Sequence, residues 1–256
     1  MTDTVLPSPR RPFIEVTGFR FRLWPIVLAA VLMQGILVPT REAARWIYKH
    51  NIDLFQHQAW VFLGLAMLLQ ATAGVIAIQV MQRVLPRSDG HLRWPPGKTY
   101  VLPAVGIGVA MALIMLVADF WPQLLSHTAP EANYPGSAVG WVSMMMLAGV
   151  NEEPIFRGLL VGMLVVLVPG RLRVGRLDLP VAAYIVALMF GLAHYDSFLH
   201  QPLHLAIAQQ LYAFGFGLTY VWLMERTRSL LAPIIAHGLS DAIEVGVVIW
   251  LAAAWA

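Results

Sequence analysis

Cysteine is absent from the sequence, which excludes disulfides, thiolate metal sites and a cysteine nucleophile. Charge is scarce as well: aspartate, glutamate, lysine and arginine make up 12% of the 256 residues, whereas hydrophobic residues make up 59%. This composition lies outside the range of soluble domains and predicts an integral membrane protein. The sequence also lacks internal repeats and a basic, aromatic-rich segment typical of nucleic-acid binding. We therefore expect membrane lipid, and no nucleic acid, as a partner.

Apolar runs of spanning length determine the expected fold. A helix needs roughly 20 apolar residues to cross a bilayer, and in lipid the backbone must satisfy its own hydrogen bonds, which favours helices. The sequence predicts an all-α, polytopic membrane helix bundle with seven transmembrane helices, or eight if the last run breaks near Glu244. The predicted spans are residues 24–38, 59–81, 100–120, 138–168, 180–194, 203–224 and 230–256.

Arginine and lysine gather in alternate connections between these spans. Positive loops stay in the cytoplasm, so the pattern predicts a cytoplasmic N-terminus in a multi-pass protein of a bacterial or archaeal cell membrane. Three cations depart from it, because Arg41, Arg45 and Lys49 fall on the predicted outer side. We expect them on an interfacial helix whose Trp46 dips into the headgroups. The cations that follow the pattern are Arg10, Arg11, Arg20, Arg22, Arg83, Arg87, Arg93, Lys98, Arg171, Arg173, Arg176, Arg226 and Arg228.

Three charges inside the fourth span indicate a functional site, because a charge at membrane depth costs roughly 2.5–3.5 kcal/mol on insertion scales. Residues four apart share a helix face, so Glu153 stacks over Arg157 while Glu152 points about 100° away, without a partner on its own helix. An unpaired carboxylate suits a general base. Pro154 cannot donate to the carbonyl of Val150, so we expect a kink beside it. A purely structural Glu153–Arg157 lock stays open as the alternative.

Two further spans carry groups of complementary chemistry. Phe190 and His194 are one turn apart at the end of the fifth span, and His237 and Asp241 share a face of the last span. A single histidine in a span is more often a hydrogen bond between helices than a catalytic group. With Glu152, however, three spans each place an acid or base inside the membrane, which favours catalysis.

These motifs also resemble a known family. Glu-Glu-x-x-x-Arg at 152–157, Phe-x-x-x-His at 190–194 and His-x-x-x-Asp at 237–241, in this order on apolar segments, resemble the CAAX protease and bacteriocin-processing (CPBP) family of intramembrane endopeptidases. The resemblance covers residues 138–256 and implies a catalytic helical core there, whereas the preceding spans resemble no family. We therefore expect three regions: a basic cytoplasmic arm over 1–22, N-terminal transmembrane helices over 23–137 and the catalytic core over 138–256.

The resemblance also implies roles for single residues. Glu152 would activate the attacking water with help from His194, while His237 and Asp241 would polarise the scissile carbonyl or stabilise its oxyanion. Members often have asparagine at the position of Asp241. Because an anion is a poor oxyanion donor, Asp241 would instead orient His237. The supporting residues would be Glu153, Arg157 and Phe190.

Metal dependence stays open at this point. Glu152, His194 and His237 could bind zinc together with a water molecule, but the same residues can act without metal, as the family resemblance implies, and we expect no cofactor. A second cluster, Asp196, His200 and His204, has a spacing that could bind a cation, although a solvated loop is the favoured interpretation.

The resemblance predicts an endopeptidase that hydrolyses a membrane-associated protein or peptide, at a CAAX-type tail or a leader. The alternatives are a non-catalytic membrane scaffold of the same fold and a proton-coupled transporter, since transporters also place ionisable groups at broken helices.

Overall fold

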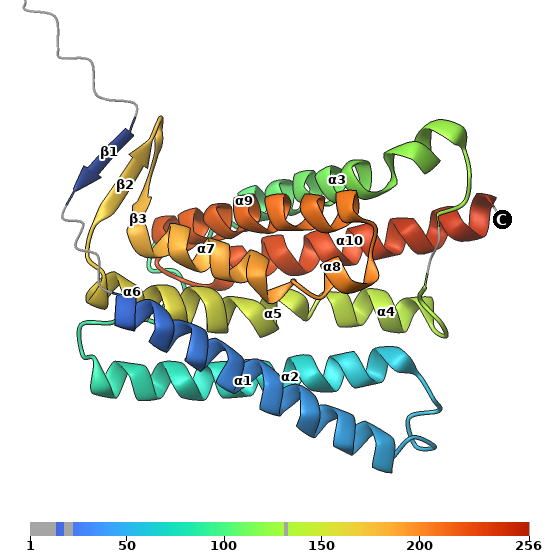
Figure 1. Ribbon diagram of the computed structural model, residues 1–256, viewed down its shortest axis with the longest axis horizontal. Coiled ribbons are helices and arrows are strands. Elements are labelled where there is room, and N and C mark those ends of the chain that lie inside the picture. The colour runs from blue at the N-terminus through green and yellow to red at the C-terminus, as the bar shows by residue number, and fades with distance from the viewer. Residues whose placement is uncertain (1–13, 18–22, 131–132, 256) are drawn as a thin grey trace, which may run out of the picture.

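The computed structural model describes residues 14–17, 23–130 and 133–255 (Figure 1). The predicted basic arm therefore lies outside the described residues, apart from 14–17. The chain forms an all-α bundle with a small sheet at one end, which confirms the predicted fold class. Its helices are α1 (Leu23–His50), α2 (Ala59–Val84), α3 (Val101–Ser126), α4 (Ala138–Met145), α5 (Ala148–Glu153), the π-helix η1 (Pro154–Val161), α6 (Gly162–Leu167), α7 (Val181–Ala193), α8 (Ser197–His200), α9 (Leu203–Thr227) and α10 (Leu231–Trp255).

Within the described ranges, five helical segments are long and apolar enough to cross a membrane: α1, α2, α3, α10 and the segment Val181–His200, which joins α7 to α8. The other two predicted spans are helical as well, one being the interrupted run from α4 to α6 and the other α9. Helix α10 continues past Glu244 without a break. The last predicted span is thus one continuous helix, and the expected alternative of an eighth span, which required a break near Glu244, is wrong.

Successive long segments run in opposite directions, so the sheet and the C-terminal end of α10 lie at opposite ends of the bundle (Figure 1). The interrupted run from α4 to α6 passes through the middle, with α1 and α2 on one side and α7, α9 and α10 on the other. Which end faces the cytoplasm stays a prediction.

Helix α1 is longer than the sequence suggested. A single helix of 28 residues continues through Pro39 to His50, so Arg41, Arg45 and Lys49 extend the first span. The separate interfacial helix expected for these cations is therefore wrong. A proline removes one backbone hydrogen bond, and here that loss does not end the helix.

The central run is interrupted twice. A turn at residues 146–147 separates α4 from α5, and the helix widens into the π-helix η1 at Pro154. Pro154 has no N–H to donate to the carbonyl four residues earlier, so an α-helix loses a bond at this position. π-helical segments inside α-helices are frequent at functional sites. Every residue of η1 is buried, which makes it the centre of the bundle.

Two glycines bring α10 unusually close to this central run. A Cβ atom on Gly149 would lie 2.2 Å from the carbonyl oxygen of Ile234, and one on Gly238 would lie 2.5 Å from that of Met146. Because no larger side chain fits either place, the backbones of α5 and α10 touch at two neighbouring points. Small residues permit such close approach between membrane helices.

The sequence did not predict the three-stranded antiparallel sheet at one end of the bundle. Its strands β1 (Ile14–Thr17), β2 (Arg171–Val174) and β3 (Leu177–Pro180) are ordered β1-β2-β3. Val174 pairs with Leu177, so the β2–β3 hairpin has a two-residue turn, in which Gly175 has a left-handed φ of 61°. Four-residue strands flanked by basic residues carry too short an alternation to stand out from a loop.

Candidate active site

Glu153 and Arg157 form a buried ion pair at the junction of α5 and η1. Arg157 Nη1 donates to Glu153 Oε1 at 3.0 Å, and the two side chains are 1% and 0% exposed. This confirms the predicted pairing along one face. Removal of either partner would leave a buried charge without compensation.

Aromatic rings enclose the guanidinium of Arg157. Its central carbon lies 4.4 Å from the ring centroid of Phe190, 4.9 Å from that of Tyr220 and 5.8 Å from that of Phe156. Aromatic faces attract cations, more strongly where water is excluded. Phe190 thus packs directly against the cation, and its supporting role stays a prediction. Tyr220 was missed, because a tyrosine in an apolar helix such as α9 carries no distinguishing signal.

His237 reaches the same ion pair from α10. Its Nδ1 lies 2.7 Å from Glu153 Oε1, and its ring stacks on Tyr220 with centroids 4.9 Å apart and an interplanar angle of 13°. Because a carboxylate paired with arginine accepts hydrogen bonds, Nδ1 carries the proton and Nε2 faces the rest of the site. The sequence analysis did not foresee this contact, which depends on the glycine-mediated approach of α5 and α10.

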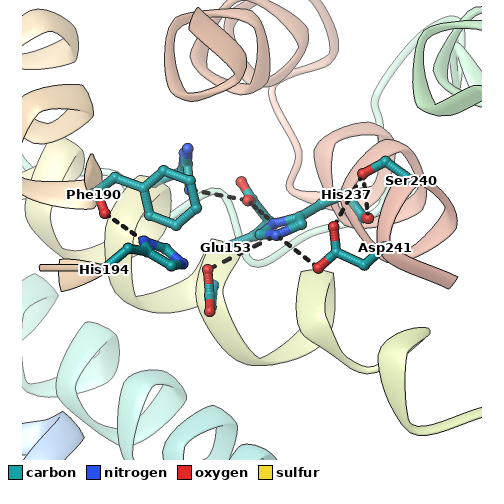
Figure 2. Close-up of polar contacts among 8 residues, drawn as sticks. Glu153, Phe190, His194, His237, Ser240 and Asp241 are labelled. Carbon is teal, nitrogen blue, oxygen red and sulfur yellow. Dashed lines mark hydrogen bonds and ion pairs between the residues drawn. The ribbon is translucent and has the colours of Figure 1, made fainter. Parts of the chain in front are cut away.

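Asp241 lies one turn further along α10. Its Oδ2 is 3.6 Å from His237 Nε2, within ion-pair range but too long for a hydrogen bond (Figure 2). Ser240 Oγ, 2.8 Å from the carbonyl oxygen of His237, lies 3.3 Å from Asp241 Oδ1. The hydrogen bond that fixes the imidazole thus comes from Glu153, and Asp241 contributes charge near the opposite nitrogen.

Glu152 points away from the ion pair, as predicted. Its Oε2 is buried without a hydrogen-bond partner and lies 3.8 Å from His237 Nε2. The side chain keeps 21% of its surface exposed, whereas that of Glu153 is fully buried. One water molecule can contact two atoms 3.8 Å apart. Glu152 is therefore accessible to a water molecule from the cavities that it lines, whereas Glu153, whose Oε2 also lacks a hydrogen-bond partner, lines neither cavity.

His194 stands where α7 ends. Its Nδ1 donates to the carbonyl oxygen of Phe190 at 2.8 Å, and this carbonyl is among the last of the helix, which lack partners within the helix. The four-residue spacing of Phe190 and His194 is what allows this contact within one helical turn. With Nδ1 occupied, Nε2 is the nitrogen that can accept a proton (Figure 2).

Two cavities meet at these residues, and Glu152 and His194 line both of them. The first, of about 170 Å³, lies among α3, α9 and α10; its wall also includes Phe190, Tyr220, His237, Asp241 and Glu244. The second, of about 320 Å³, lies between α1 and the end of α7, and arginines form part of its wall. Glu152 and His194 thus stand where a substrate entering either cavity would meet them.

The positions of the possible donor atoms bear on whether the site could hold a metal ion. Over the described ranges, no three histidine, aspartate or glutamate side chains are grouped closely enough to hold a metal ion. Two of the three candidate zinc ligands are histidines that each have one ring nitrogen already in a hydrogen bond. His237 is bonded to Glu153, and His194 is bonded to the backbone. In the second cluster, Asp196 and His200 form an exposed pair 3.4 Å apart.

Residues 134–243 match the family model described as Type II CAAX prenyl endopeptidase Rce1-like. The match includes all the predicted site residues, from Glu152 to Asp241, and confirms the family that the three motifs indicated. Comparison with curated proteins and with solved structures gave no match.

Proposed function

We propose that the protein hydrolyses peptide bonds with a water molecule activated by Glu152, because residues 134–243 match the Type II CAAX prenyl endopeptidase Rce1-like family model. The observation that carries the proposal is the contrast between two adjacent carboxylates. Glu153 is fully buried, binds Arg157 and His237 through one oxygen and lines neither cavity, whereas Glu152 has an unpartnered oxygen and lines both cavities. A general base must reach both the water and the substrate.

In this mechanism His237 donates a hydrogen bond to the carbonyl oxygen, and Glu152 takes a proton from the water. Glu153 holds Nδ1 of His237, so that Nε2–H of the protonated ring can donate to the oxygen of the scissile carbonyl as negative charge develops there. Asp241, 3.6 Å from Nε2, favours the protonated ring by its charge. His194 assists Glu152 through its free Nε2.

The proton balance follows from these positions. Glu152 takes a proton from the attacking water, whose oxygen bonds to the carbonyl carbon. The tetrahedral intermediate then collapses, the carbon–nitrogen bond breaks, and the proton held by Glu152 passes to the departing amine. The immediate products are a carboxylic acid and a free amine; the acid then gives up the second proton of the water to the amine or to solvent and becomes a carboxylate, and Glu152 is again ionised.

We further propose a membrane-anchored protein or peptide as the substrate. The family description names CAAX prenyl endopeptidases, and the site lies among helices long enough to cross a bilayer. A lipid-modified cysteine near the C-terminus would hold such a substrate in the membrane beside the cavities. A peptide with an S-farnesylated cysteine followed by three residues is therefore the first probe to use.

The test compares purified protein and variants in liposomes that contain this peptide, with cleavage read by mass spectrometry. Glu152→Gln should lower turnover by ~10²–10⁴-fold, the usual contribution of a general base. Asp53→Asn makes the same chemical change at a side chain that is 96% exposed, and should leave turnover unchanged. Wild-type turnover in Glu152→Gln would refute the proposal. A folded wild type that cleaves no membrane-anchored peptide would favour the scaffold alternative.

A further inference from the structure

A third cavity, of about 460 Å³, lies between the β2–β3 hairpin and the C-terminal end of α9, at the end of the bundle that carries the sheet (Figure 1). Its volume is within the range of small-molecule sites, ~300–1,000 Å³. None of the residues around this hairpin cavity lines either cavity at Glu152. The mechanism proposed above uses none of them.

The hairpin cavity has an excess of positive charge, because four arginines and two carboxylates line it. The arginines are Arg171, Arg176, Arg226 and Arg228, and the carboxylates are Asp178 and Glu225. Arg171 binds both carboxylates, Asp178 at 2.9 Å and the two oxygens of Glu225 at 3.1 and 3.0 Å. The acidic groups of the cavity are therefore already paired with one of its four arginines.

The other three arginines have no such partner. Over the part of the chain that the structure describes, no carboxylate lies within ion-pair distance of Arg176, Arg226 or Arg228. All three side chains are exposed. A guanidinium stays charged at any physiological pH, and its donors match the oxygens of a phosphate group in pairs. The cavity thus offers three guanidiniums to an anion.

Two of these arginines are held in place by α9. The central carbon of the Arg226 guanidinium lies 5.5 Å from the ring centroid of Trp222, one turn earlier, in a cation–π contact. Arg228 follows the last residue of the helix with a left-handed φ of 55°, and its N–H donates to the carbonyl of Met224. Glycine is the usual residue at this kind of helix end. An arginine at a strained position points to a use for its side chain.

The outer face of α9 leads from the middle of the bundle to the hairpin cavity. Ile207, Leu211, Leu218 and Trp222 recur at helical spacing, and Arg226 follows them on the same face. Ile207 and Leu211 are exposed, and Trp222 is half-buried. An exposed apolar face of a membrane helix contacts acyl chains, and tryptophan is typical of the level of the headgroups. The cavity therefore lies where this face meets the headgroups.

We propose that the hairpin cavity binds the phosphate headgroup of an anionic phospholipid through Arg176, Arg226 and Arg228, with an acyl chain along the outer face of α9. A lipid fits better than a free phosphate, because only a lipid covers the apolar side chains that lead to the arginines. Basic pockets between membrane helices on the cytoplasmic side bind such headgroups, and the basic loops assign this end of the bundle to the cytoplasm. The bound lipid would join the hairpin, through Arg176, to α9.

Native mass spectrometry of the full chain, released from detergent with defined lipids, tests the inference. Wild type should retain phosphatidylglycerol, which is anionic, in preference to phosphatidylcholine, which has the same phosphate but no net charge. Arg176→Gln, Arg226→Gln and Arg228→Gln together should weaken binding of phosphatidylglycerol at least ~tenfold. The reason is that one arginine beside anionic lipid contributes roughly a fivefold gain in affinity.

The matched control removes three other exposed cations from the same predicted side of the membrane. Arg83→Gln, Arg87→Gln and Lys98→Gln together change the net charge equally, and none of these residues lines the hairpin cavity. Affinity for phosphatidylglycerol should stay at the wild-type level. Thermal unfolding verifies the fold of both triple variants. If the cavity variant is unfolded, the three single variants replace it, each with an expected loss of roughly fivefold.

Several results would overturn the inference. One is equal retention of the two lipids by wild type. Another is an equal loss in both triple variants, which would assign the attraction to the total charge of this end. Competition by inorganic phosphate without any preference among lipids would identify a free-phosphate site, and preferential binding of an acidic peptide would identify a protein partner. The measurement involves no peptide cleavage, so its outcome is independent of the role of Glu152.

Discussion

Glu153 Oε1 and His237 Nδ1 lie 2.7 Å apart, although 84 residues separate them in the sequence. The same oxygen also accepts from Arg157 at 3.0 Å. One carboxylate thus neutralises a buried cation on its own helical run and fixes an imidazole on another helix. The ion pair, for which a purely structural role was an open alternative, is therefore joined directly to the proposed catalytic histidine.

The shared carboxylate predicts that stability and activity separate in a double variant. Glu153→Gln and Arg157→Gln should each destabilise the protein by ~3–5 kcal/mol, because each leaves a buried charge unpaired. The double variant should recover part of this stability, yet stay inactive, since His237 has lost its anionic partner. Thermal unfolding in detergent and peptide cleavage measure the two effects. Single variants as stable as wild type would show that the pair does not contribute in this way.

The histidines distinguish metal-free from metal-assisted chemistry. If no metal takes part, chelator should leave cleavage nearly intact. His237→Ala should then be more severe than His194→Ala, because loss of an oxyanion donor costs ~2.7–4 kcal/mol. Metal analysis of active protein and cleavage assays with chelator measure this. Stoichiometric zinc that is lost and restored together with activity would instead assign Glu152, His194 and His237 as ligands.

Turnover should partly survive replacement of the Asp241 carboxylate by an amide. Its Oδ2 is too far from His237 Nε2 for a hydrogen bond, so the carboxylate contributes charge and does not fix the ring. Asp241→Asn should keep measurable turnover, since an amide can itself donate to the oxyanion, whereas Asp241→Ala should lose more. Cleavage rates of the two variants test this. Equal and complete loss would indicate that the charge of Asp241 is essential.

Close packing of α5 against α10 predicts a steric effect far from any polar atom. Gly149→Ala would place a carbon 2.2 Å from the carbonyl oxygen of Ile234, so the helices must separate, at a cost of ~1–3 kcal/mol. Activity should also fall, because separation moves His237 away from Glu153. Gly106→Ala is the control: nothing lies within 4 Å of its added carbon, and alanine favours a helix by about 1 kcal/mol over glycine. A stable, active Gly149→Ala protein would contradict the packing argument.

The hairpin predicts a pH effect outside the membrane. Arg171 donates to Asp178 at 2.9 Å and to both oxygens of Glu225 at 3.1 and 3.0 Å. Partial burial raises the pKa of Asp178, but Arg171 and Arg173 lower it more, so the net pKa falls below its ordinary value of 3.8. The stabilisation is therefore present above pH 3.8 and is lost as the pH falls through the lowered pKa.

Asp178→Asn should consequently lower the unfolding temperature at pH 7, by an amount equivalent to less than about 1 kcal/mol because the pair is partly exposed. The difference from wild type should shrink as the pH is lowered toward 3. Thermal unfolding in nanodiscs over this pH range measures it, with Asp53→Asn as a control. A difference that stays constant with pH would exclude the ion pair as its cause.

The helix bundle and the candidate site residues could be predicted from the sequence, because both depend on local features. Span length follows from apolar runs, and the three motifs place Glu152, His194 and His237 on separate helices. The contact between His237 and Glu153 could not be predicted, because it depends on how closely α10 approaches α5 at Gly149 and Gly238. The contribution of Tyr220 to the site could not be predicted either, because it depends only on the position of this ring beside Arg157 and His237.

The pairing of β1 with β2 bears on how the chain is made. Thr17 pairs with Arg171, so a strand translated before the first transmembrane helix finds its partner only after the central run has been synthesised. Closing a loop of this length costs little more than closing one half as long, by ~0.6 kcal/mol. Synthesis proceeds from the N-terminus, so β1 stays unpaired until the β2–β3 hairpin has been made, while α7, α9 and α10 are still to follow.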